Sequence, residues 1–154
     1  MPVINLDLDP TYVHAAGVTP AADLDGGSLL PLFTGAADRK RPAIFWHFPG
    51  YPDKPVPRGR ALVCRTHPAG VIRQGDCKLP LYHEECLQDA GRDRLAVHRA
   101  AEPYHLDGDI GERTDLANTK TSKRDKLLAS LLAWMEKSKA PFPKTKQTGL
   151  TAAW

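Results

Sequence analysis

A predicted β-hairpin over residues 71–83 constrains the fold of this chain more than any other feature. It opens with the β-branched pair Val71-Ile72, and Gly75-Asp76 follows three residues later. β-branched residues favour strands, and a Gly-Asp pair favours the tight turn between two of them. An isolated hairpin is only marginally stable in water. Further strands and a cover for the apolar face must therefore come from elsewhere in the chain.

An amphipathic helix over residues 122–139 is the natural cover. Its apolar side chains recur at spacings of three and four residues, which places them on one helical face: Leu127, Leu128, Leu131, Leu132 and Met135. Basic residues in the last turn suit the helix dipole, and Pro141 ends the helix. The stripe is too short for a coiled coil, so we interpret it as core.

Shorter elements complete the prediction for residues 42–117. Strands are expected over 43–48 and 103–106, with weaker candidates over 61–65 and 95–99. Because proline cannot donate to a β-ladder, Pro80 and Pro103 should lie at strand ends or edges. The polar residues 107–117 are interpreted as a tight turn in which Asp side chains accept backbone hydrogen bonds and Glu112 pairs with a basic residue.

The N-terminal residues predict a helical and loop arm. Residues 3–8 are expected to form a short strand, followed by a helix with Asp9 as N-cap and Pro10 at its first position, ending at Gly17. A second helical turn carries four large apolar residues, Leu29, Leu30, Leu32 and Phe33. One short turn cannot bury that many, which predicts a docking segment. The expected fold class is α+β, with a small antiparallel sheet of about four strands covered by the C-terminal helix.

Composition excludes several classes of protein. The net charge of +3 is modest and the charged residues are interspersed, which argues against a nucleic-acid binder. No apolar run approaches the 18 residues or so that a membrane helix requires. The first ten residues lack the basic and apolar regions of a signal peptide, so localisation is left open. Three cysteines without a disulfide pattern predict free thiols.

Four segments, in order, resemble the sulfatase family. These are "LDLDPTYVHAAGV" from Leu6, "LDGGSLLPLFTG" from Leu24, "FWHFPGY" from Phe45, and "AGVIRQGDCKL" with the later "PYHLDGDIGERTDLA". They are similar to "vDlyPTlLelAGi", "lDGvSLLPLLtG", "lFWHfPHY", and "gAIRkGDyKLi" with "ELYNLkdDiGEttNLA". The resemblance is to the C-terminal subdomain of this arylsulfatase-like branch of the alkaline-phosphatase-like superfamily.

The resemblance implies a division of the chain into three parts. Residues 1–41 would be the end of the α/β catalytic domain, 42–140 the C-terminal subdomain, and 141–154 a tail. Family enzymes hydrolyse sulfate esters with a formylglycine formed in a C-x-P-S-R-type motif and a bound cation, usually calcium. None of the three cysteines stands in such a motif, and the family's metal ligands precede the first matched segment. No catalytic residue and no cofactor are therefore assigned to this chain.

Two residues are candidates for contact with substrate by the same resemblance. The loop after the "FWHF" strand lies at the rim of the family's active-site pocket, which places His47 and Tyr51 nearest to a substrate. The family often has His at the position of Gly50, so part of that pattern is missing here. The alternative is that His47 is a packed, hydrogen-bonded strand residue.

A second constellation resembles a zinc site. Five soft ligands fall within 23 residues, namely Cys64, His67, Cys77, His83 and Cys86. The expected arrangement of a C-x2-C pair facing a second tight pair is missing, so we favour no metal in this chain.

Two hypotheses follow. The first is a C-terminal sulfatase fragment whose partner is the missing N-terminal catalytic domain, with a sulfate ester as substrate only in the full-length enzyme. The fragment then has a packing and pocket-rim role and no catalysis of its own. The second is a non-enzymatic zinc-binding or protein-interaction module. Exposure of the apolar residues 29–33 distinguishes a fragment from a self-sufficient module.

Overall fold

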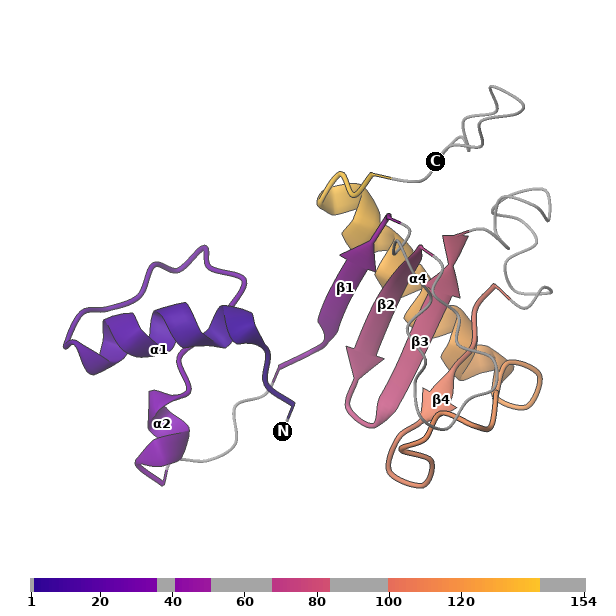
Figure 1. The fold of residues 1–154 in the computed structure, drawn as a ribbon, viewed down its shortest axis with the longest axis horizontal. Helices are drawn as coiled ribbons and strands as arrows, with labels where there is room; N and C mark the ends of the chain where they lie inside the picture. The colour runs from indigo at the N-terminus through magenta and orange to yellow at the C-terminus, as the bar shows by residue number, and fades with distance from the viewer. Residues whose placement is uncertain (1, 36–40, 51–67, 84–99, 142–154) are drawn as a thin grey trace. The chain divides into compact units, whose positions relative to one another are not determined.

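The computed structural model describes residues 2–35, 41–50, 68–83 and 100–141 of the 154-residue chain. The chain forms two compact units, Met1–Ile44 and Phe45–Trp154. Figure 1 shows the helical elements of the first unit and the sheet with its long helix in the second. Among the described residues, no helix is both long and apolar enough to span a membrane.

The first unit contains a 3-10 turn and two short helices. The turn is η1 (Asn5–Asp7), and the helices are α1 (Leu8–Ala15) and α2 (Leu30–Phe33). The expected strand over residues 3–8 is therefore wrong, and α1 begins before the predicted cap Asp9. The Asp7 carboxylate accepts the backbone N–H of Ile4 at 3.0 Å, which folds this segment into a turn, and more distant residues hold the same carboxylate in place. Gly17 follows the helix with φ +79°, as the sequence predicted.

The second unit is built on an antiparallel sheet in the order β1-β2-β3-β4 (Figure 1). Its strands are β1 (Ile44–Phe48), β2 (Ala69–Gln74), β3 (Cys77–Tyr82) and β4 (Tyr104–His105). The predicted hairpin is confirmed, because Gln74 pairs with Cys77 around the two-residue turn at Gly75-Asp76. Gly75 has φ +59° and Asp76 has no positive φ, the pattern of a type II′ turn. The weaker strand candidates over 61–65 and 95–99 lie outside the described residues.

Pro80 lies inside β3, opposite Val71, and not at a strand end as the sequence suggested. Its carbonyl accepts the backbone N–H of Glu102 at 3.1 Å, so the backbone polar groups of residue 80 face the 100–102 segment. The missing N–H is therefore on that side, and the ladder between β2 and β3 is unaffected. Pro103 immediately precedes β4, as expected.

Helix α4 (Thr121–Lys137) covers one face of the sheet (Figure 1). The predicted apolar stripe is confirmed: all five of its members are buried, and Leu127 and Leu131 are fully so. They meet Ile72, Leu79 and Leu81 of β2 and β3, which have no exposed surface. The α+β fold class, with a four-stranded antiparallel sheet, a C-terminal helix and an N-terminal helical arm, is confirmed.

Candidate functional site

His47 is the predicted substrate-proximal residue that the structure describes. It lies on β1, half-buried, with its Nε2 2.6 Å from the carbonyl oxygen of Pro141. A carbonyl only accepts, so Nε2 carries the proton and donates. In the neutral ring Nδ1 is then an unprotonated acceptor, buried and without a hydrogen-bond partner among the described residues. Tyr51, the other candidate, lies outside those residues.

His83 lies next to His47. Their ring centroids are 5.3 Å apart and the planes are inclined at 66°, an edge-to-face arrangement. A Cβ at residue 70 would make ordinary contact with the ring, 3.6 Å from Cε1 of His83, and a tight contact of 3.2 Å with Sδ of Met135. His83 is fully buried, and burial, followed by the charge of His47, lowers its pKa to about 4. His83 is therefore uncharged at neutral pH.

The zinc constellation is not assembled as a single site. Cys77 begins β3 and His83 follows its end. Six residues of extended strand separate their Cα atoms by about 20 Å at roughly 3.3 Å per residue. Zinc holds its ligand atoms at about 2.0–2.3 Å, so these two side chains cannot share one ion. Cys64, His67 and Cys86 lie outside the described residues, and within those residues no group of three His, Cys, Asp or Glu side chains could hold a metal ion.

The acidic turn after β4 has a structural explanation. The Asp109 carboxylate accepts the backbone N–H groups of Arg113 and Thr114, both at 2.8 Å. Glu112 adopts φ +52° and pairs with Lys78 of β3 at 2.5 Å. Both features confirm the interpretation of this segment as a tight turn closed by side chains.

A buried ion pair in the first unit escaped the sequence analysis. Both terminal nitrogens of Arg41 donate to the carboxylate of Asp7, which also accepts the backbone N–H groups of Ile4 and Gly27. Burial alone would raise the pKa of Asp7, but the hydrogen bonds outweigh it and lower the pKa to about 2. Thirty-four residues separate Asp7 from Arg41, so no local pattern reveals the pair.

Comparison with known proteins gives one consistent class. No protein-family model and no curated protein matches the chain. The solved structures that match include sulfatases. BT4656, solved with its substrate D-glucosamine-2-N,6-O-disulfate, is 22% identical with a TM-score of 0.60, and the match covers 92% of this chain and 25% of that one. BT1596, a 2-O GAG sulfatase, is 27% identical with a TM-score of 0.55, covering 87% and 25%.

A third structure, from Bacteroides thetaiotaomicron and described as a candidate sulfatase, is 27% identical with a TM-score of 0.56, covering 86% of this chain and 24% of that one. The chain thus spans about a quarter of the length of the sulfatases it matches. The resemblance drawn from the sequence motifs is confirmed: this is a sulfatase-like chain, and its partial coverage fits a C-terminal subdomain.

Proposed function

We propose that this chain is the C-terminal part of a sulfuric ester hydrolase and supplies packing and part of the rim of the substrate pocket. The main support for this proposal is the structural match between this chain and the sulfatases. It includes nearly all of this chain, yet only about a quarter of each sulfatase. The remaining three quarters would contain the catalytic α/β domain.

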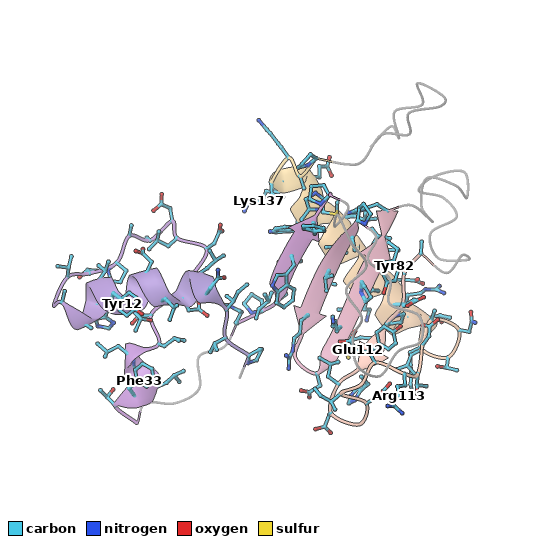
Figure 2. All side chains as sticks on the ribbon, viewed as in Figure 1. Tyr12, Phe33, Tyr82, Glu112, Arg113 and Lys137 are labelled. Atoms are coloured by element: carbon cyan, nitrogen blue, oxygen red, sulfur yellow. The ribbon has the colours of Figure 1, made fainter. Side chains whose placement is uncertain are left out.

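The four apolar residues expected to be exposed in a fragment are exposed only in part: Leu29 is buried, Leu30 and Leu32 are half-buried, and Phe33 alone is exposed. Other exposed apolar side chains of the first unit support a lost partner. Tyr12 on α1 is 67% exposed and Phe33 on α2 is 74% exposed (Figure 2). Val3, Leu6 and Leu8 are exposed as well. Apolar side chains in this density on two short helices are typical of a surface that packs against another part of a protein. A self-sufficient module would bury them.

The chemistry would lie in the rest of the enzyme. The proposal places the formylglycine and the divalent cation, usually calcium, in the catalytic domain, because none of this chain's cysteines stands in the required motif. A cation and fixed hydrogen-bond donors stabilise the charge on a sulfuryl group as it is transferred. His47 would lie at the pocket rim, held by its bond to Pro141.

The alternative, a non-enzymatic zinc-binding or protein-interaction module, has less support. Of the candidate zinc ligands, the structure describes Cys77 and His83. A single zinc ion could use only one of them, because they lie at opposite ends of β3. A metal analysis of purified protein is still informative, and stoichiometric zinc would favour this alternative.

The experiment is a hydrolysis assay with 4-nitrophenyl sulfate and glucosamine 6-sulfate. Purified recombinant chain should release no product above the buffer rate, whereas the longer native polypeptide carrying these residues should turn over at least one sulfate ester. Material from an empty-vector strain, purified identically, controls for contaminating sulfatase. Turnover by the purified chain that is absent from this control would contradict the proposal that the catalytic residues lie outside this chain.

A further inference from the structure

Strand β1 contacts the C-terminal end of α4 through two side chains of one face. Phe45 stacks on Trp134 of α4, with ring centroids 5.0 Å apart and ring planes within 5°. Successive side chains of a strand point to opposite faces, so His47 lies on the same face as Phe45. Its Nε2 donates at 2.6 Å to the carbonyl oxygen of Pro141, just beyond the end of the helix (Figure 1). The side chain of His47 therefore joins β1 to the chain that leaves α4.

The backbone at the end of α4 fixes the path of the chain toward Pro141. The N–H of Lys139 donates to the carbonyl of Glu136 at 3.1 Å. The next N–H, that of Ala140, donates to the carbonyl of Met135 at 2.9 Å. Lys139 adopts φ +51°, so these residues form a Schellman motif, which ends a helix and turns the chain. Pro141 follows this turn directly, and its acceptor carbonyl is thus held by the helix end.

The imidazole of His47 offers no donor to a sulfate ester. The oxygens of a sulfate group only accept hydrogen bonds, and the Nε2 proton is already donated to Pro141. Nδ1 carries no proton in this tautomer and is buried. The ring also packs edge-to-face against the fully buried His83. Contact between His47 and a substrate would require this arrangement to be broken.

We propose that His47 is a positioning residue and not a substrate contact: its bond to Pro141 holds the end of β1, and the Pro49 and Gly50 that follow, against the end of α4. This inference rests on the proposed function, in which the chain beyond β1 reaches the rim of the substrate pocket. His47 is the last residue but one of β1, so its bond restrains the strand end itself. A misplacement of about 1 Å in a binding site can weaken substrate positioning strongly.

The first test compares three substitutions of His47 in the full native polypeptide, with 4-nitrophenyl sulfate and glucosamine 6-sulfate as substrates. Gln places an N–H donor near the position of Nε2, Asn places one near Nδ1, and Phe keeps a ring without either. His47→Phe and His47→Asn should raise KM about 3- to 10-fold, the range that one neutral hydrogen bond supplies. The kcat should stay within about twofold, the pattern of lost uniform binding. His47→Gln should restore a KM close to the native one.

A second pair of variants tests the acceptor. Lys139→Pro is incompatible with φ +51° and removes the N–H that bonds to Glu136, so the chain would leave α4 in another direction. Lys139→Gly removes the same basic side chain but keeps the left-handed turn. Lys139→Pro should therefore raise KM as His47→Phe does, and the double variant should show little further change, because both substitutions break one bond. Lys139→Gly should leave KM unchanged.

The outcomes separate this inference from the proposed function. Rescue by Asn and not by Gln would mean that Nδ1 acts on the substrate, and a native KM in Lys139→Pro would mean that Nε2 does. Either result overturns the inference and leaves the proposed function standing. A fall in kcat at unchanged KM in His47→Phe does the same, because it indicates a catalytic contact.

A native polypeptide that hydrolyses no sulfate ester overturns the proposed function instead. Thermal unfolding then decides whether His47 attaches β1 to Pro141. His47→Gln should keep the native Tm, and His47→Asn should lower it by about 2 °C through the lost hydrogen bond. Equal Tm values in these two variants would overturn the attachment as well.

Discussion

The guanidinium of Arg41 and the carboxylate of Asp7 form a bidentate ion pair that is almost completely buried, with 9% and 1% of their side-chain surfaces exposed. The same carboxylate accepts backbone N–H groups from Ile4 and Gly27, at 3.0 Å each. One carboxylate thus connects the start of η1, the loop before α2 and the residues that lead into β1. These hydrogen bonds to one carboxylate join three segments that no regular secondary structure connects.

Replacing Asp7 with Asn should therefore destabilise the first unit. The change leaves Arg41 buried without its counter-charge, and breaking a buried pair in this way costs about 3–5 kcal/mol. Asp9→Asn, at an exposed position two residues away, is the matched control and should change stability by less than about 0.5 kcal/mol. Hydrogen exchange of the α1 amides measures the stability of the first unit in both variants. Equal protection in the two would contradict the role of Asp7 in holding this unit together.

The ion pair of Asp7 and Arg41 also predicts that the first unit loses stability in acid. The pKa of Asp7 is about 2 in the folded chain, against an ordinary value of 3.8. The unfolded state therefore binds more protons between these values, and stability falls as pH drops through them. About 2 kcal/mol should be present above pH 4, and it should be lost as the pH falls to 2 and below. The Asp7→Asn variant should lack this dependence.

Gly26→Ala should disrupt the same region for a steric reason. A Cβ at residue 26 would lie 1.8 Å from the carbonyl oxygen of Leu6, and backbone atoms cannot move aside cheaply. We expect a loss of about 3 kcal/mol, at the upper end for overpacking. Gly108→Ala is the control, because nothing lies within 4 Å of its added Cβ. Denaturant unfolding compares the two, and similar midpoints would refute the close approach.

His83 predicts a second pH dependence, in the second unit. Its pKa is about 4 when folded and 6.5 ordinarily, so the unfolded state takes up the proton first as pH falls. Stability should be complete above pH 6.5 and should decrease by about 3 kcal/mol toward pH 4. Replacing His83 with Leu should flatten the pH profile in this window. Replacing the exposed His105 with Asn should leave it unchanged.

Leu131 tests the contact between α4 and the sheet. It has no exposed surface and lies within the apolar stripe over β2 and β3. Leu131→Ala should cost about 2–5 kcal/mol through lost burial and the resulting cavity. Lys123→Ala, on the exposed side of the same helix, should stay within about 0.5 kcal/mol. Thermal unfolding of the two variants gives the comparison directly.

Local patterns predicted the second unit well. The alternation and turn residues around Gly75 located the hairpin, and the spacing of the leucines located α4. These patterns are clear in the sequence because the hairpin and α4 each bury one face against the other, which requires apolar residues at regular spacing. Pro80 was wrongly predicted to lie at a strand end or edge. Proline is tolerated inside a strand when its nitrogen faces away from the neighbouring ladder, and the sequence does not show which way that nitrogen faces.

The first unit and the histidine pair were predicted less well. The N-terminal residues form η1 and an early α1 because of Asp7, whose partners Gly27 and Arg41 are 20 and 34 residues away. His47 and His83 were each noted, one for substrate and one for zinc, but not as neighbours. Their approach depends on the order of β1, β2 and β3 in the sheet, which no local pattern in the sequence reveals.

The most direct test of the account is the size of the native protein in its source cells. An antibody raised against residues 107–117 would detect it by immunoblot. Because 92% of this 16.9-kDa chain corresponds to 25% of a matched sulfatase, the account predicts a band near about 60 kDa. A single band at 16.9 kDa would contradict it, and the function of this fold would then have to be sought in binding.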